Sequence, residues 1–189
     1  MGKNKISKVL IIEGSPDTSN GRLAEKFGKL LRKELEQHMP KIYMGKGKFQ
    51  AIKRFKDERK ADFRFLLIDL DRDEEFKEEE LANLDLEKYK EWVFFMVQEV
   101  EAWFISQPQI LDKYYGIDLS KKLKSKHPEK VKNPAKLLQQ LTKKTRKREP
   151  YHKVKHAVDL LPLLDIQQLR TDFKDFDRLI KKILNPTDK

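Results

Sequence analysis

A short apolar run that ends in alternating carboxylates constrains this chain more than any other part of its sequence. Residues 63–68 are mostly apolar β-formers, and Asp69, Asp71 and Asp73 follow them. A near-continuous apolar run of this length, flanked by charge, is typical of a strand buried on both faces of a parallel sheet. Because ligand sites of open α/β sheets lie at the carboxyl ends of the strands, these aspartates mark a candidate site.

The spacing of these carboxylates indicates a cation. Asp69 and Asp71 are two residues apart, so on a strand their side chains point to the same face. Two carboxylates about 4–5 Å apart repel each other, and a buried strand end would not normally keep such a pair alone. With no Cys or His nearby, the hard oxygen donors favour Mg²⁺ or Mn²⁺ over zinc. The alternative is a solvated acidic loop after a core strand.

Basic residues are concentrated in one part of the chain. Residues 120–155 contain 14 Lys or Arg and two acids, a net charge of +12, so the remaining residues carry −1 of the total of +11. A surface that tracks a phosphate backbone has this charge distribution, which favours nucleic acid as the partner over a merely solvated charged surface. The candidate nucleic-acid-binding residues are Lys46, Lys48, Lys143, Lys144, Arg146, Lys147, Arg148 and Lys153.

The totals exclude several other classes of protein. The 189 residues suit one domain with a small appendage, and the absence of Cys rules out a disulfide framework and a Cys-based zinc site. The first residues are basic and polar rather than a signal peptide, and no apolar run approaches membrane-spanning length. We therefore expect a soluble cytoplasmic protein with no membrane contact.

The order of the remaining patterns predicts an α/β fold. Helical stripes separate the strand-like runs until residue 117, after which we expect helices only. The further predicted strands are 8–12, 41–44 and 91–97. Pro108 is expected to open a helix that Gly116 ends, and Asn133 to cap the helix that begins at Pro134. We expect a core over residues 1–116 with a central, mostly parallel sheet, and a helical basic extension, 117–189, packed on it as one compact unit.

Carboxylates follow three of the expected strands. Glu13 comes directly after the first strand, Asp69 and Asp71 end the third, and Glu101 lies just past the fourth. Since the carboxyl ends of parallel strands meet at one edge of a sheet, we expect these groups to converge.

The sequence around these carboxylates resembles a known group of domains. Glu13-Gly14 followed later by Asp69-Leu70-Asp71 is similar to the Toprim arrangement of topoisomerases, primases and overcoming-lysogenization-defect nucleases. A longer resemblance, from about residue 8 to 184, is to the Toprim-like family called domain of unknown function 4276. It adds Glu101-Ala102-Trp103 and Lys153-Val154-Lys155-His156. The chain departs from that family after Gly14, where related chains usually keep an acidic residue near the helix start and residues 15–20 intervene here. It also departs at Ser106-Gln107, where the family tends to have a small residue and an Asp.

The resemblance implies a Mg²⁺- or Mn²⁺-dependent phosphodiesterase or nuclease, with DNA favoured over RNA. A role in phage or mobile-element defence with an ATPase partner is also implied. Asp69 and Asp71 would hold the metal, Glu13 would act as general acid or base or as a second ligand, and Glu101 would complete a two-metal site. A lysine would neutralise the phosphate, with Lys155, Lys153 and Lys46 as candidates. His156 would donate to a phosphate or a leaving oxygen, unless it is structural.

Two other functions compete with this hypothesis. In the first, the domain lacks catalysis and only binds nucleic acid or a partner through its basic stretch. Alternatively, the turn-rich segment 12–21 before a helix is similar to the phosphate loop of flavodoxin-like FMN reductases. Glu13 would place a negative charge beside that phosphate, which disfavours a flavin. The absence of a Gly-Lys-Ser/Thr sequence disfavours a P-loop NTPase.

Overall fold

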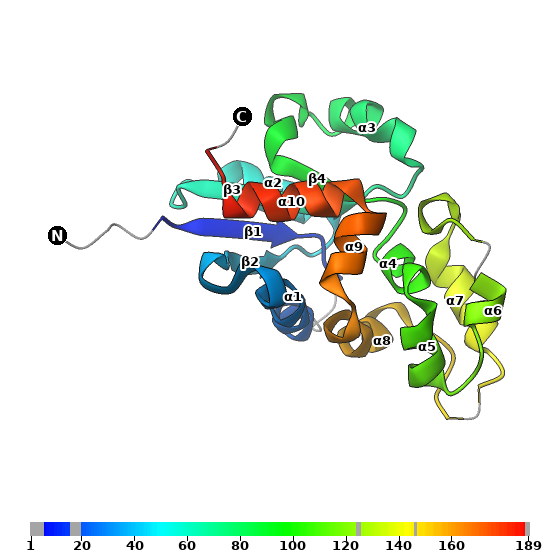
Figure 1. The fold of residues 1–189 in the computed structure, drawn as a ribbon. Coiled ribbons are helices and arrows are strands. Elements are labelled where there is room, and N and C mark those ends of the chain that lie inside the picture. Colours follow the sequence, from blue (N-terminus) through cyan, green and yellow to red (C-terminus); the bar gives the residue numbers. More distant parts are fainter. Residues whose placement is uncertain (1–5, 16–19, 124–125, 146, 188–189) are drawn as a thin grey trace.

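The computed structural model of the chain describes residues 6–15, 20–123, 126–145 and 147–187. Its centre is a sheet of four parallel strands in the spatial order β2-β1-β3-β4 (Figure 1). The strands are β1 (Lys8–Ile12), β2 (Lys41–Met44), β3 (Phe63–Asp69) and β4 (Val93–Met96). The prediction of an α/β, Rossmann-like fold with a parallel sheet and flanking helices is therefore confirmed.

Helices cover both faces of the sheet. One face packs against α1 (Asn20–Leu35) and α10 (Lys174–Leu184), and the opposite face packs against α2 (Lys48–Asp57) and α3 (Lys77–Asn83). The strand residues on the first face are Leu10, Ile12, Phe65, Leu67, Phe94 and Met96. Those on the second face are Val9, Ile11, Leu66, Ile68, Val93 and Phe95. Because both faces are buried, the strands have the near-continuous apolar sequences that predicted them.

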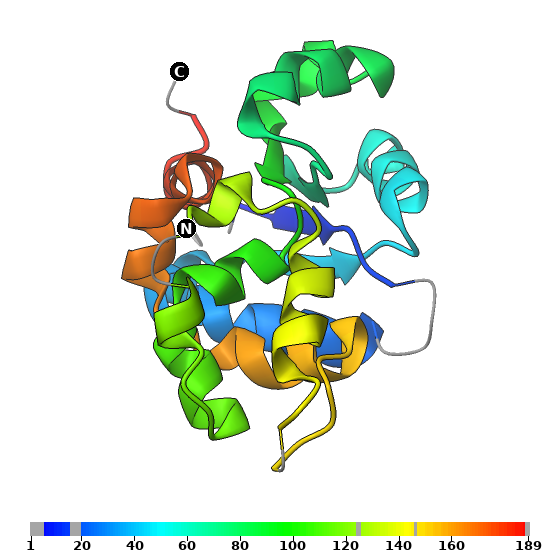
Figure 2. The same ribbon diagram turned by 90° about the vertical axis from the view of Figure 1, so that its right-hand side faces the viewer.

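The other helices gather mainly beyond the carboxyl ends of the strands, and Figure 2 looks onto that end of the molecule. They are α4 (Glu101–Ser106), α5 (Pro108–Tyr115), α6 (Ser120–Leu123), α7 (Pro134–Thr142), α8 (Lys153–Leu160) and α9 (Ile166–Asp172). The 3-10 helices are η1 (Glu36–His38), η2 (Glu74–Phe76), η3 (Glu87–Trp92), η4 (Pro128–Lys130) and η5 (Leu161–Leu163). Within the described residues, no helix has the length and apolar character needed to cross a membrane.

Several local predictions can be compared with these boundaries. Pro108 opens α5, and Gly116 ends it with a left-handed φ of 68°, as expected. The fourth strand is shorter than predicted, because the residues up to Trp92 form η3. Asn133 lies at the N-cap position of α7, directly before Pro134, as predicted, but it does not cap the helix through its side chain. An N-cap residue normally has extended backbone angles, whereas Asn133 has a φ of 53° and its side chain makes no capping bond.

The expected domain boundary at residue 116 stays a prediction. Helices from both sides of that position contribute to one hydrophobic core, which joins Phe27 of α1 and Trp103 of α4 to Phe176 of α10. The C-terminal helices α9 and α10 thus complete the layer that covers the sheet. The basic segment between α5 and α8 lies beyond the ends of the strands (Figure 1).

Asp175 of α10 makes a contact that ties this helix to the outermost strand. Its Oδ2 accepts a 2.9 Å hydrogen bond from the backbone N–H of Phe95, and its Oδ1 lies 3.2 Å from the Lys77 ammonium. Replacing Asp175 by alanine should lower the free energy of unfolding by about 2–3 kcal/mol, because a buried N–H loses its acceptor. Urea unfolding measures this loss. Glu149→Ala, which removes an exposed ion pair with Lys155, is the control and should change stability little. Equal losses in both variants would contradict the role given to Asp175.

Candidate functional site

The candidate site lies at the point of the sheet where two successive connections between strands run on opposite faces. From β1 the chain passes through α1 to β2, and from β2 it returns through α2, on the opposite face, to β3 on the other side of β1. The point between β1 and β3 is therefore the topological switch point, where open α/β sheets bind ligands. Glu13 directly follows β1, and its Oε2 accepts a 3.0 Å hydrogen bond from the backbone N–H of Asp69 at the end of β3. The predicted meeting of these two carboxylate-bearing strand ends is observed.

Asp69 and Glu101 share the ammonium group of Lys153. Lys153 Nζ, at the start of α8, lies 3.8 Å from Asp69 Oδ2 and 3.9 Å from Glu101 Oε2, and it donates a hydrogen bond to Glu99. Asp69 Oδ1 also accepts a 3.2 Å hydrogen bond from the backbone N–H of Val100. The structure thus brings together Glu13, Asp69, Glu101 and one of the three candidate lysines.

Tyr151 holds the other oxygen of Glu101. Its hydroxyl donates a 2.7 Å hydrogen bond to Glu101 Oε1, and both side chains are buried. Glu101 Oε2 is buried and has no hydrogen-bond partner. Tyr151 was not predicted, because nothing local in the sequence links it to a glutamate 50 residues earlier. Only the packing of the segment before α8 onto α4 reveals the contact.

Burial makes the carboxylates of this site unusual acids. It raises the pKa of Asp69 well above its ordinary value, and the nearby charge of Glu13 raises it further. Burial likewise raises the pKa of Glu13. Burial raises the pKa of Glu101 to about 7, although Lys153 opposes the change. Burial lowers the pKa of Lys153, but the charges of Glu101 and Asp69 outweigh burial and raise it overall. Perturbed groups of this kind cluster at functional sites.

Asp71 is placed differently from the prediction. The strand ends at Asp69, and Asp71 has a left-handed φ of 60°, so the alternation of a strand does not extend to it and the expected shared face is wrong. Its exposed carboxylate forms a 2.7 Å ion pair with Lys48, which also lies 3.4 Å from Glu80. Asp71 still contributes to the charge of the site, since it raises the pKa of Glu13 and Asp69.

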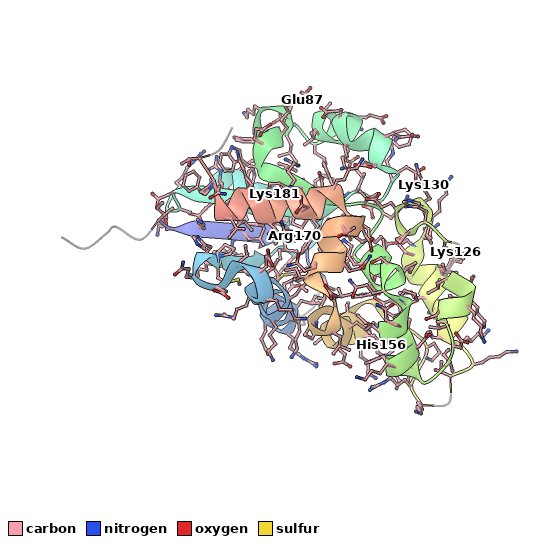
Figure 3. All side chains as sticks on the ribbon, in the orientation of Figure 1. Glu87, Lys126, Lys130, His156, Arg170 and Lys181 are labelled. Atoms are coloured by element: carbon pink, nitrogen blue, oxygen red, sulfur yellow. The ribbon has the colours of Figure 1, made fainter. Side chains whose placement is uncertain are left out.

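Lys155 and His156 contact other residues than the carboxylates that Lys153 contacts. Lys155 is exposed and forms a 2.7 Å ion pair with Glu149. His156 is buried between α5 and α8, and Figure 3 labels its position. Its Nδ1 accepts a 3.0 Å hydrogen bond from the backbone N–H of His152 and lies 3.0 Å from the Tyr115 hydroxyl. The structure gives neither side chain a contact with Asp69 or Glu101, and a catalytic role for either stays a prediction.

The environment of His156 leads to a pH prediction. Burial lowers the pKa of His156, and the charge of Lys155 lowers it further. The folded protein therefore takes up this proton only at a lower pH than the unfolded chain, whose histidine pKa is about 6.5. Stability should fall as the pH decreases below about 6.5, and His156→Gln should flatten that fall. Urea midpoints between about pH 5 and 7 test this, and an unchanged slope in the variant would contradict it.

The predicted nucleic-acid-binding residues other than Lys153, which lies in the site itself, occupy two regions. Lys46 is exposed and Lys48 is engaged with Asp71, both in the turn that starts α2. Lys143, Lys144 and Lys147 are exposed on the segment after α7. Arg148 lies on the same segment, where its Nε donates a 2.9 Å hydrogen bond to the Tyr114 carbonyl and its guanidinium stacks on the Tyr114 ring. Arg146 lies outside the described residues.

Glycines allow two turns of the site to approach each other closely. The backbone N–H of Gly45 donates a 2.7 Å hydrogen bond to the Ile12 carbonyl, and that of Gly47 donates a 2.8 Å bond to the Gly14 carbonyl. A Cβ atom at Gly14 would lie 2.5 Å from the Gly45 carbonyl oxygen, which real structures do not tolerate. The turn after β1, which carries Glu13, and the turn after β2 are therefore fixed to each other by main-chain contact.

A cavity of about 300 Å³ opens beside Glu13, Asp69 and Lys153. These three side chains form its polar side. Its apolar walls come from α1, α8 and the strand ends, namely Leu23, Phe27, Met44, Met96, Val100, Val154, Ala157 and Leu161. A largely apolar cavity with a few convergent polar groups is typical of a small-molecule or cofactor site.

The carboxylates of the site are possible ligands of a divalent metal ion. Among the described residues, no three Asp, Glu or His side chains form a ready-made metal site. Mg²⁺, however, usually keeps several waters and is held by one or two carboxylates together with substrate phosphates. Glu13 and Asp69 provide such a pair, and the unpartnered Oε2 of Glu101 lies near the same lysine. The donor set fits a hydrated ion that completes its coordination with substrate.

Comparisons with known proteins identify a family. A family model described as "Domain of unknown function (DUF4276)" matches residues 21–184. The match includes Asp69, Glu101 and Lys153, whereas Glu13 precedes it. No curated protein and no solved structure matches the chain significantly. Since the matched segment covers most of the 189 residues, the chain belongs to the DUF4276 family.

Proposed function

We propose that this protein is a Mg²⁺- or Mn²⁺-dependent phosphodiesterase that cleaves nucleic acid and is related to the Toprim nucleases. The observation that supports this most is the pair formed by Glu13 and Asp69 at the switch point, with the Lys153 ammonium beside it. Buried carboxylates with raised pKa values, next to a cation and a cavity, suit chemistry on a phosphate better than a purely structural role.

The residues of the site have distinct roles in this proposal. Glu13 and Asp69 would hold the ion, with Glu101 and Asp71 as further acidic groups. A bound divalent ion polarises the phosphate and makes a nucleophilic water available at neutral pH. Lys153 would neutralise the charge that develops on the phosphate oxygens. Glu101, whose pKa is about 7, can exchange a proton near neutral pH and is the candidate general acid or base.

The partners in this proposal come from charge and from the resemblance. The exposed lysines after α7 and in the turn before α2 would bind the phosphate backbone, with DNA favoured over RNA. The resemblance to Toprim-like proteins adds an ATPase partner, a cytoplasmic location and a role in defence against phages or mobile elements.

The test is incubation of the full chain with supercoiled plasmid, single-stranded DNA and RNA, with Mg²⁺, with Mn²⁺ and with a chelator. Bis(p-nitrophenyl) phosphate, a small phosphodiester, is included because it needs no nucleic-acid contacts. Cleavage that requires the metal and stops with the chelator is expected. Binding that weakens with salt, without cleavage of any phosphodiester, would overturn the enzyme in favour of a second function.

That second function is a binding module without catalysis. One observation favours it, namely that the Lys153 ammonium lies within 4 Å of carboxylate oxygens of Asp69, Glu99 and Glu101 and offsets part of their negative charge. A lysine held among these carboxylates reduces the electrostatic need for a bound ion. Calorimetric titration with Mn²⁺ separates the two functions, since the module predicts no binding at this site.

A further inference from the structure

An exposed phenylalanine stands beside the candidate site. Phe49, in the first turn of α2, has 78% of its surface accessible, although the other apolar residues of this helix, Ala51, Ile52 and Phe55, are buried against the sheet. Exposure of an aromatic ring to water is unfavourable, and single exposed apolar residues are common on proteins. Phe49 differs from such residues because it lies next to the candidate site.

The turn that carries Phe49 is fixed to the acidic site by two contacts. The Gly47 N–H donates a hydrogen bond to the carbonyl of Gly14, the residue after Glu13. Lys48, the neighbour of Phe49, forms the 2.7 Å ion pair with Asp71. Phe49 thus follows a turn that main-chain and ion-pair contacts hold against the acidic site, and Lys46 on the same turn is exposed.

The same turn borders the apolar cavity. Gly47 lines it together with Glu13, Asp69 and Lys153, while Phe27 and Met96 belong to its apolar walls. The apolar cavity and the residue pair Lys48-Phe49 therefore both adjoin the acidic groups, the first through Glu13 and Asp69 and the second through the ion pair of Lys48 with Asp71. This combination differs from a surface that binds only the phosphate backbone, because it offers contacts to flat, apolar ring faces.

Resting on the proposed function, we propose that the substrate is single-stranded nucleic acid, that Phe49 stacks on one of its bases and that the cavity receives a neighbouring base. In a duplex, the faces of the bases are covered by stacking, so neither feature could reach them. In a single strand the faces are free, and aromatic side chains beside a basic groove bind them with little sequence preference. The polar side of the cavity then lies next to the phosphate between the two bases.

The test measures binding without cleavage. Fluorescence anisotropy of a labelled single-stranded oligonucleotide is recorded with the full chain in a chelator, and a duplex of the same sequence is the comparison. Phe49→Ala should weaken single-strand binding by about 5- to 150-fold, the range for loss of one base–aromatic stack. Phe49→Trp should restore it. Ile6→Ala, at an exposed apolar residue preceding β1 at the opposite end of the strands, is the matched control and should bind as the wild type.

A second variant tests the cavity separately. Ala157 lines it from α8, and Ala157→Leu would occupy part of its volume. Weaker binding of the single strand by this variant, with duplex binding unchanged, supports the inference. Thermal unfolding of both variants shows whether a loss of binding reflects a loss of fold.

The outcomes separate this inference from the proposed function. The inference is overturned if the wild type binds single strand and duplex equally, or if Phe49→Ala binds like the wild type. The proposed function still stands in that case if the wild type hydrolyses bis(p-nitrophenyl) phosphate. Phe49-dependent binding of single strands, with no hydrolysis of any phosphodiester, supports the base contacts and overturns the function.

Discussion

Replacing Asp69 by asparagine is expected to reduce metal-dependent phosphodiester hydrolysis by more than about 100-fold. Loss of a residue that only hydrogen-bonds to a metal ligand reduces activity by up to about 100-fold, and loss of a ligand itself should cost more. Asp69 is 7% exposed and is the residue at which contacts from Glu13, Val100 and Lys153 meet. Asparagine keeps the shape and an oxygen for the Val100 N–H, but it removes the negative charge that the ion requires. Initial rates on bis(p-nitrophenyl) phosphate measure the effect directly.

The control for this variant lies at the opposite end of the same strand. Asp62, just before β3, is exposed and accepts hydrogen bonds from Ser7. Asp62→Asn makes the same chemical change away from the site and should retain wild-type rates. Because burial and the charge of Glu13 disfavour ionised Asp69, Asp69→Asn should also unfold at a higher temperature than the metal-free wild type. Retained activity in Asp69→Asn, or an equal loss in Asp62→Asn, would contradict the site.

Replacing Lys153 by methionine is expected to have opposite effects on metal binding and on catalysis. Its ammonium lies within 4 Å of carboxylate oxygens of Asp69, Glu99 and Glu101 and competes with a divalent ion for their charge. Half of the side chain is exposed, so solvent weakens this competition, and we expect Mn²⁺ to bind about 5- to 10-fold more tightly without it. Hydrolysis should nevertheless slow by about 100-fold or more, because no cation then neutralises the phosphate.

Lys155 provides the matched control, since it lies two residues further along α8 and pairs with exposed Glu149 instead. Lys155→Met should leave both the calorimetric Mn²⁺ affinity and the rate on bis(p-nitrophenyl) phosphate near their wild-type values. If Lys155→Met slows hydrolysis while Lys153→Met does not, the lysine of the site has been assigned incorrectly. Weaker Mn²⁺ binding by Lys153→Met would show that this lysine supports the ion rather than competing with it.

The fold was predictable to the extent that it depends on local pattern. The apolar runs that became β1 and β3 are buried on both faces, so their sequences carry a signal that does not depend on distant contacts. The start of β4 was harder to predict from the sequence, because the apolar Trp92 belongs to η3 and packs against Phe63 and Phe65 from outside the strand. Amino-acid composition alone does not distinguish an apolar residue within the strand from one that packs against the strand from η3.

The site, like the fold, was predictable where it depends on local sequence and not where it depends on tertiary packing. The meeting of Glu13 and Asp69 follows from the rule that parallel strands end at one edge, and it was predicted. The choice of Lys153 over Lys155 depends on how α8 is rotated against α4, and the exposure of Asp71 depends on one left-handed residue after the strand. Tyr151 reaches Glu101 only because distant segments pack together.

The contact between Asp175 and β4 has a consequence for solubility. Among the residues that the structure describes, β4 has a strand neighbour on one side only, and unpaired amides on such a strand can recruit another chain as a further strand. The Asp175 carboxylate occupies the Phe95 amide, and α10, with Lys77 and Arg178 around that carboxylate, places charge along the same border. The contact thereby blocks one position at which another chain could add a strand, and we expect it to reduce aggregation through this edge of the sheet.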